Sequence, residues 1–184
     1  MIFRTTPLAG AFVVELDPRV DERGLFARSF CEREFAEHGL ATRFPQGNVS
    51  WSSRSGTLRG LHWQAAPHAE AKLVRCTAGA VHDVIVDLRR GSPTCLRWFG
   101  VELSARNRRA LYVPEGFAHG FLTLADESEV SYWMSQSHAP EAARGLRFDD
   151  PRLAIAWPAR PGVISARDLG YPDFEAGLLY GDPT

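Results

Sequence analysis

Seven short runs rich in β-branched and aromatic residues follow one another between residues 57 and 135. Turn sequences such as Arg-Gly-Ser-Pro and Pro-Glu-Gly separate them, at about the interval expected of a β-sandwich or barrel. No long helical pattern lies between the runs, which argues against a parallel sheet connected by helices. The sequence therefore predicts an all-β protein, and a jelly-roll barrel or sandwich fits best. The predicted strands are TLRGLHWQ, AKLVRCT, AVHDVIVDL, LRWFGVEL, RALYVP, HGFLTLA and EVSYWMS.

Shorter elements are predicted on either side of these runs. Residues 11–16 alternate as a strand does, and the DERG turn favours a hairpin with residues 25–30. CEREFAEHG predicts one short helix that ends at Gly39. After Met134 the sequence alternates poorly, so we expect it to wrap the barrel in turns and short peripheral helices. Residues 1–184 are predicted to form a single domain.

The charge and hydropathy patterns exclude two classes of partner. With 21 Lys and Arg residues against 22 Asp and Glu, the chain lacks the clustered positive charge that binds nucleic acid. Its apolar runs span only a few residues, whereas a membrane-spanning helix needs about 20. The first ten residues carry no export signal, and the three cysteines form no CxxC pair. We therefore expect a cytoplasmic protein with neither a nucleic-acid nor a membrane partner.

Several strands or strand ends place a proton-transfer side chain among apolar neighbours. Such a group costs free energy in an apolar setting unless it is paired or used. A His base, a Lys cation and a Tyr hydroxyl are the groups needed to remove a proton next to a carbonyl and to return one from the other side. A single His or Tyr of this kind is more often structural, but the set favours proton-transfer chemistry. Its members are His62, Lys72, the adjacent pair His82 and Asp83, His119 and Tyr132.

A metal site is the main competing interpretation. Jelly-roll proteins often bind a metal through two histidines separated by one residue, and this chain has no HxH. Binding by His62, His82 and His119 together stays open. Motifs of nucleophilic hydrolases and phosphate-binding loops, GxSxG and GxxxxGK[ST], are absent from the sequence.

Arginines near the candidate base favour anion binding. Guanidinium groups suit bidentate phosphate contacts, and Arg23, Arg54, Arg59 and Arg75 are the candidates. In a regular strand Arg59 and His62 would face opposite sides. Both can reach one site only if Gly60 kinks the strand.

Eight segments occur in an order that resembles the dTDP-4-dehydrorhamnose 3,5-epimerase family, and together they cover about residues 5–172. The resemblance implies a cupin-type jelly roll and a homodimer that exchanges N-terminal strands. It also implies cofactor-free epimerisation, at C3 and C5, of a nucleotide-linked 4-keto-6-deoxy sugar in the dTDP-rhamnose and polysaccharide pathway. The segments are DERG, QGNVS, GTLRGLHWQ, AKLVRC, VHDVIVDLRRGSPT, YVPEGFAHGF, RFDDPRLAIAW and ISARDLGYP.

The resemblance also implies roles for individual residues. His62 falls on the general base and Asp168 on the carboxylate that orients it. Tyr132 falls on the proton donor, and Lys72 on the cation near the C4 oxygen. His119 and Asp83 match a polar pair beside the base. The implied contacts to the nucleotide and phosphates are Arg23, Phe26, Gln46, Asn48 and Arg59.

Four positions depart from the family pattern, and all belong to substrate binding. Arg28 stands where the family has Glu, His138 replaces a Tyr that stacks on the base, Ala143 replaces an acidic contact, and Arg167 replaces a Lys. The catalytic residues are intact, so the chemistry is the safer inference. A CDP-linked substrate, epimerisation at only one carbon, or a non-catalytic cupin that binds a sugar nucleotide stay open as alternatives.

Overall fold

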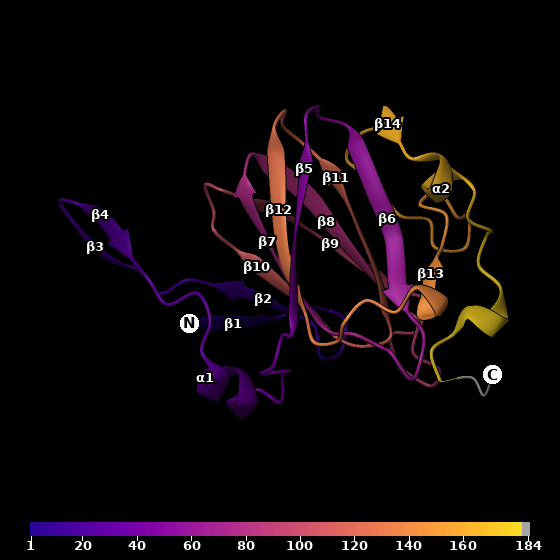
Figure 1. Ribbon diagram of the computed structural model, residues 1–184, viewed down its shortest axis with the longest axis horizontal. Helices are drawn as coiled ribbons and strands as arrows, with labels where there is room; N and C mark the ends of the chain where they lie inside the picture. Colours follow the sequence, from indigo (N-terminus) through magenta and orange to yellow (C-terminus); the bar gives the residue numbers. More distant parts are fainter. Residues whose placement is uncertain (182–184) are drawn as a thin grey trace.

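Two antiparallel sheets face each other and enclose the core of the protein (Figure 1). The structure is a computed structural model that describes residues 1–181, so the last three residues of the predicted domain lie outside it. The prediction of an all-β fold with a few short peripheral helices is confirmed. Within residues 1–181 no helix is long and apolar enough to cross a membrane.

Each sheet combines strands that are distant in the sequence. All seven strands predicted between residues 57 and 135 form close to their predicted bounds. The first sheet has the order β1 (Ile2–Thr5), β2 (Phe12–Glu15), β10 (Ala110–Val113), β7 (Lys72–Ala78), β12 (Ser128–Met134) and β5 (Gln46–Ser52). The second has the order β13 (Ala143–Gly145), β6 (Thr57–Gln64), β11 (Phe117–Thr123), β8 (Ala80–Asp87) and β9 (Trp98–Ser104), with β14 (Val163–Ile164) pairing parallel to β6.

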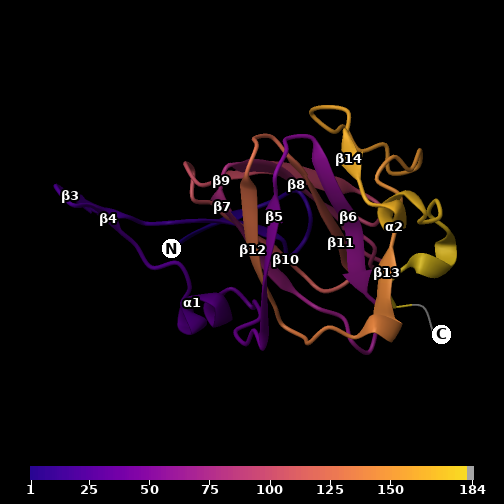
Figure 2. The same cartoon turned by 45° about the horizontal axis from the view of Figure 1, so that its top comes forward.

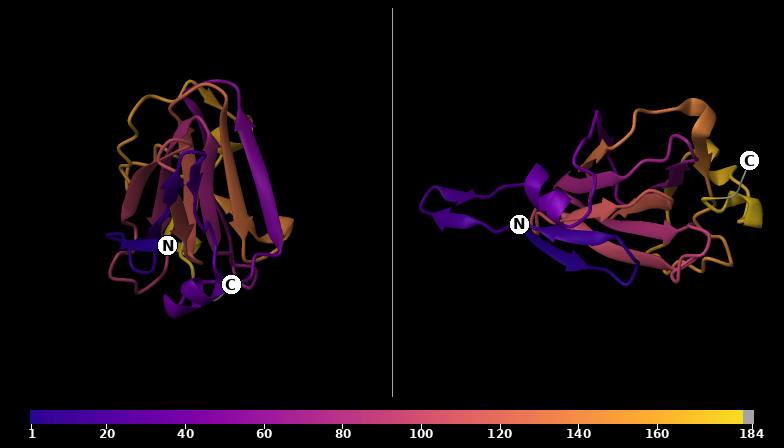
Figure 3. Two further views of the ribbon diagram at one scale, coloured as in Figure 1. Left: turned by 90° about the vertical axis from the view of Figure 1, so that its left-hand side faces the viewer. Right: turned by 90° about the horizontal axis from the view of Figure 1, so that it is seen from below.

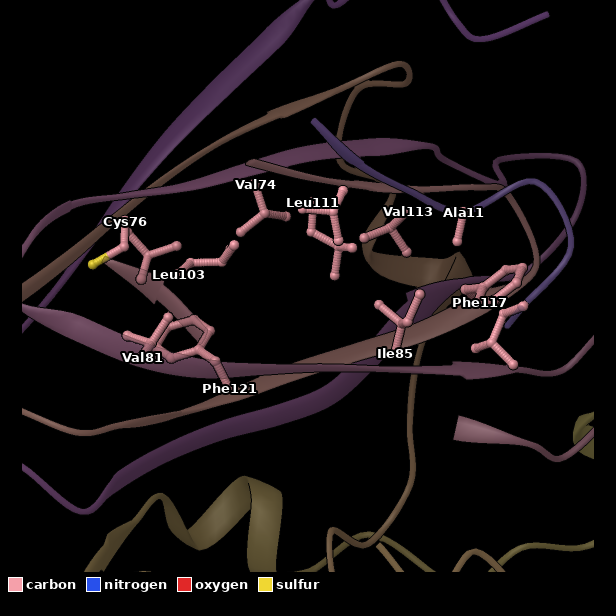
Figure 4. Packing of buried hydrophobic residues seen from close by; sticks show 13 residues of the cluster. Ala11, Val74, Cys76, Val81, Ile85, Leu103, Leu111, Val113, Phe117 and Phe121 are labelled. Atoms are coloured by element: carbon pink, nitrogen blue, oxygen red, sulfur yellow. The ribbon is translucent and has the colours of Figure 1, made fainter. Parts of the chain in front are cut away.

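The core lies between the sheets because successive side chains of a strand point to opposite faces, and the apolar ones on the inner faces meet. Val74 and Leu111 of the first sheet lie opposite Val81 and Ile85 of the second (Figure 4). On the outer face of β8, Val84 and Val86 pack beneath residues 146–178 of the C-terminal tail. Burial on both faces explains the nearly continuous apolar run of β8. Each fully buried Val or Ile contributes about 1.5–3 kcal/mol through the hydrophobic effect.

The N-terminal region differs from its prediction in one respect. The strand predicted over residues 25–30 is only β4 (Gly24–Phe26), and it pairs with β3 (Arg19–Asp21) rather than with β2. The β3–β4 hairpin, called the arm below, extends away from the barrel (Figures 2 and 3). Val20 is 74% exposed and Phe26 is 77% exposed. The arm therefore adds nothing to the core of its own chain.

Short elements complete the chain much as predicted. Helix α1 (Glu32–Glu37) follows the arm, and Gly39 takes a positive φ of +69° just after it. Phe35 of α1 is fully buried against Val14 and Tyr112 of the first sheet. The tail forms η1 (Pro140–Ala142), α2 (Ala166–Leu169) and η2 (Ala176–Leu178), and α2 lies beside β6 (Figure 1).

A β-bulge in β6 decides where its side chains point. His119 pairs with His62 and Phe121 pairs with Arg59, so two residues of β6 face the single residue Gly120 of β11. The extra residue reverses the alternation, and this brings Arg59 and His62 to the same side. Gly60 has a φ of +123°, and a Cβ atom there would lie 2.5 Å from the Gly120 Cα. The kink that the sequence required at Gly60 is present.

We predict that Gly60→Ala destabilises the protein by about 2–4 kcal/mol, because the new methyl group meets the backbone of β11 at a strained φ. Thermal unfolding followed by circular dichroism measures the change. Gly162→Ala is the control, since a Cβ atom there has nothing within 4 Å. Equal melting temperatures for the two variants would contradict this account of the bulge.

Candidate active site

A cavity of about 470 Å³ opens between the two sheets. Strands β6 and β11 line one wall, β5, β7 and β12 line the other, and residues 163–168 of the tail close one side. Seven residues singled out from the sequence line it: Arg59, His62, Lys72, His119, Tyr132, Arg167 and Asp168. The tertiary structure therefore gathers them at one site.

His62 is paired with a buried carboxylate from the far end of the chain. Its Nε2 lies 2.7 Å from Oδ1 of Asp168, whose side chain is 5% exposed. The backbone N–H of Gly60 donates to Oδ2 of Asp168 at 3.2 Å. Burial raises the pKa of Asp168, but the hydrogen bonds from His62 and Gly60 outweigh it and leave that pKa below its ordinary value. An ionised Asp168 keeps the proton on Nε2 and leaves Nδ1 with a free lone pair.

Local sequence explains how Asp168 is held. Ser165 is the N-cap of α2, and its Oγ accepts a hydrogen bond from the Asp168 N–H at 3.0 Å. Just before it, Ile164 of β14 pairs with Leu58 of β6. This pairing anchors the start of α2 beside the strand that carries His62.

A second histidine and carboxylate lie beside the first pair. His119 faces His62 across the β6–β11 ladder, and its Nε2 lies 3.0 Å from both carboxylate oxygens of Asp83. Asp83 is fully buried. Of His82 and Asp83, it is therefore Asp83 that faces inward.

Lys72 reaches across the cavity from the first sheet. Its side chain is 7% exposed, and its Nζ donates to the backbone oxygen of His62 at 3.3 Å. Glu70, also 7% exposed, places Oε1 3.2 Å from the same Nζ. The sequence analysis did not single out Glu70. Its spacing of two residues from Lys72, which puts both side chains on one face of an extended chain, was the available signal.

Tyr132 and His62 approach the cavity from opposite walls. Tyr132 lies on β12 of the first sheet and His62 on β6 of the second. A flat ring bound between them would meet a base on one face and a hydroxyl on the other. This geometry suits removal of a proton from one face of a carbon and its return to the opposite face.

Two arginines at the cavity, Arg59 and Arg167, carry positive charge that no carboxylate described above balances. Within residues 1–181, neither Arg59 nor Arg167 has a carboxylate within ion-pair distance. Arg59 donates to the oxygens of Ser52 and Trp51, and Arg167 donates to the Tyr171 hydroxyl at 2.8 Å. Their unpaired charge favours an anionic ligand, such as one that carries phosphate groups.

Three further candidates lie along β5 and just beyond β12. Asn48 pairs with Tyr132 in the ladder, and the amide of Gln46 hydrogen-bonds to Asn48 at 3.3 Å. The carbonyl of Gln46 also accepts the backbone N–H of His138 at 2.8 Å. Gln46, Asn48 and His138 thus form one polar strip beside Tyr132.

The structure does not bring three predicted binding residues to the cavity of their own chain. Arg23 and Phe26 lie on the arm, where Arg23 pairs with Asp21 at 2.5 Å. Arg28 pairs with Glu34 at 2.7 Å at the base of the arm. Of the other arginines considered, Arg75 points away from the cavity into a separate pocket on the outer face of β7 and β12.

The three-histidine metal site considered from the sequence does not form. His82 lies on the opposite face of β8 from Asp83, where it contacts Gly100 and lies 6.3 Å from the ring of Trp157. It therefore cannot converge with His62 and His119. In the described part of the chain no group of three His, Cys, Asp or Glu side chains could hold a metal ion.

Other lining residues were missed by the sequence analysis. They are Ser50, Thr57, Leu58, Gly120, Phe121, Val163, Ile164 and Ser165. Ser165 could have been found, because Ser followed three residues later by an acidic residue is typical of a helix start. Ser50 could not, since β5 itself was not predicted. The strand exposes Val49 and Trp51 and turns its polar residues inward, which reverses the usual pattern.

Comparison with known proteins identifies close relatives over nearly the whole chain. The family model described as dTDP-4-dehydrorhamnose 3,5-epimerase matches residues 5–176. A dTDP-4-dehydrorhamnose 3,5-epimerase from Methanothermobacter thermautotrophicus is 48% identical, over 97% of this chain and 97% of that protein.

Solved structures agree with this likeness. The crystal structure of dTDP-4-dehydrorhamnose 3,5-epimerase from Elizabethkingia anophelis matches with a TM-score of 0.92 and 41% identity, over 95% of this chain and 96% of that chain. The dTDP-6-deoxy-D-glucose-3,5-epimerase from Legionella pneumophila, solved in complex with dTDP-4-keto-L-rhamnose, matches with a TM-score of 0.90 and 37% identity. That match covers 100% of this chain and 99% of the Legionella chain.

We predict that Asp168→Asn removes an acid-dependent part of the folding stability. The lowered pKa of Asp168 means that the carboxylate stabilises the folded state above its ordinary pKa of 3.8, and that this contribution is lost as the pH falls through the folded-state value. Urea unfolding should thus show the wild type more stable than the variant at pH 7, with a gap that narrows below pH 3.8. Asp17→Asn, at an exposed position, is the control. A gap that stays constant with pH would contradict the prediction.

Proposed function

The chain belongs to the dTDP-4-dehydrorhamnose 3,5-epimerase family, and from this premise we propose that it converts dTDP-4-dehydro-6-deoxy-D-glucose into dTDP-4-dehydro-L-rhamnose. The reaction inverts C3 and C5, both of which lie next to the C4 ketone. One observation carries the proposal. The His62–Asp168 pair and Tyr132 face each other from opposite sheets across a single cavity.

The residues support a sequence of proton transfers through an enolate. Nδ1 of His62 takes the proton from the carbon next to the ketone, and the electrons of the broken C–H bond move onto the C4 oxygen. Asp168 stabilises the imidazolium that forms, as a carboxylate beside a catalytic histidine does. The Lys72 ammonium stabilises the negative C4 oxygen. The Tyr132 hydroxyl then gives a proton to the same carbon from the other face, which inverts it, and solvent restores both protonation states.

Substrate binding follows from the charge and the shape of the same region. Arg59 and Arg167, which lack carboxylate partners among the described residues, suit the diphosphate. The polar strip of Gln46 and Asn48 suits the edge of a nucleobase, and the His138 ring can stack on it. The bound dTDP-sugar of the Legionella relative supports a dTDP-linked substrate.

We further propose that two copies form a dimer in which each arm completes the partner's cavity. The arm leaves its own barrel and exposes Val20 and Phe26, which is costly in water unless another surface covers them. β5 is an edge strand that exposes Trp51 by 55%. A two-fold dimer would cover such surfaces and bring Arg23 and Phe26 to a cavity.

The first test follows deuterium exchange in D2O by proton NMR, with dTDP-4-dehydro-6-deoxy-D-glucose as substrate. We expect the wild type to lose both the C3 and C5 proton signals. We expect His62→Ala to lower the exchange rate by about 10²- to 10⁴-fold, because its base is gone. His68→Ala is the matched control, since His68 lies outside the cavity.

The outcomes separate the alternatives. Exchange at one carbon alone would identify a single-site epimerase. Binding of the nucleotide sugar without exchange would identify a non-catalytic protein. Wild-type exchange rates in His62→Ala would contradict the mechanism.

A second test addresses the exchanged arms. The double variant Arg23→Ala/Phe26→Ala and the variant His62→Ala should each be nearly inactive alone. Co-expressed, they should recover about a quarter of the wild-type rate, because half of randomly paired dimers hold one intact site. Light scattering should give twice the chain mass. A rate equal to the sum of the two parents would contradict arm exchange.

A further inference from the structure

Glu70 is a buried acid next to the cavity that the proposed mechanism does not use. It does not line the cavity and contacts Lys72 instead, with Oε1 3.2 Å from Nζ. Glu70, Lys72 and Val74 alternate along one face of the extended chain, and Val74 belongs to the core between the sheets. The carboxylate therefore points into the barrel.

The environment of Glu70 is unfavourable for a purely structural role. Its Oε2 is buried and has no hydrogen-bond partner among residues 1–181. A buried carboxylate with an unsatisfied oxygen costs free energy, and apolar residues can often replace a buried ion pair without loss of stability. The presence of a buried Glu70–Lys72 pair therefore needs an explanation other than stability.

The N–H groups of Lys72 provide this explanation. An ammonium carries three N–H groups. The backbone oxygen of His62 accepts one at 3.3 Å, and Oε1 of Glu70 forms an ion pair with Nζ at a distance of 3.2 Å. These two oxygens come from different segments and hold Nζ between them. The third N–H is left for the cavity that Lys72 lines.

We propose that Glu70 is the positioning residue that aims this third N–H at the C4 oxygen of the substrate. The inference rests on the proposed function. Before the reaction Glu70 balances the charge of Lys72, so that the buried ammonium stays in place. When the C–H bond breaks, the negative charge on the C4 oxygen meets a donor that already points at it. A donor oriented in advance needs no rearrangement at that moment, and it favours the charged enolate over the neutral ketone.

Loss of Glu70 should therefore affect kcat more than KM. We expect Glu70→Gln to lower kcat for deuterium exchange by about 10- to 100-fold, the range seen when a partner that orients an active-site group is removed. KM should stay within about threefold, since the neutral ketone gains little from this N–H. Glu102→Gln, at an exposed position on β9, is the matched control and should keep both constants.

A second comparison guards against simple misfolding, because removing one member of a buried ion pair can unfold a protein. Circular dichroism establishes that each variant is folded. Lys72→Met is compared with Lys72→Met/Glu70→Gln, in which the charged pair is removed as a unit. If Glu70 acts through Lys72, the two exchange rates should agree within about twofold.

Each outcome decides the inference. A wild-type kcat in folded Glu70→Gln overturns it, and so does a raised KM with unchanged kcat. A further loss of rate when Glu70→Gln is added to Lys72→Met also overturns it, because Glu70 would then act on something other than Lys72. A wild-type protein that exchanges neither proton refutes the proposed function itself, and the inference falls with it.

Discussion

The contact of Gly60 with Gly120 is the constraint on which the active site depends. β6 carries an extra residue at this point, and the two strands approach each other so closely that a Cβ atom on Gly60 would collide with Gly120. Glycine is therefore needed at both positions. The bulge turns Arg59 and His62 toward one cavity, and the N–H of Gly60 also donates to Asp168. One local distortion therefore turns Arg59 and His62, the proposed phosphate contact and base, toward the same cavity, and it helps to hold Asp168, the carboxylate paired with His62.

Charge pairing distinguishes two sets of side chains at the cavity. Three groups of the candidate site each have their own carboxylate: His62 with Asp168, His119 with Asp83, and Lys72 with Glu70. These carboxylates are largely buried, so the pairs are held in one orientation in a medium of low polarity. The two arginines of the cavity have no such partner within residues 1–181. Their positive charge is therefore available to the anionic substrate that we propose.

The position of the arm shows which of the predicted site residues one chain brings to its own cavity and which it does not. The barrel supplies His62, Tyr132 and Lys72, the proposed base, acid and cation, from its own strands. Arg23 and Phe26 lie on a hairpin that leaves the barrel, so it is only in the proposed dimer that they reach a cavity, that of the other copy. The departures from the family pattern also concern positions to which the resemblance assigns a role in substrate binding. Arg28 pairs with Glu34 of its own chain, and the same carboxylate also pairs with the N-terminal ammonium, so two cations share one negative charge.

The sequence by itself determined the seven central strands and the side chains able to move protons, because alternation, turn residues and side-chain chemistry are local properties. The sequence analysis missed β5, whose apolar residues face outward. It also missed Glu70, which became notable only through its contact with Lys72. Only the tertiary structure decided which groups meet. His62 and Asp168 are separated by 106 positions, and their contact depends on strand register, a bulge and a tail strand. Local sequence patterns cannot predict such pairings, because these contacts form only when segments that are distant in the sequence pack together.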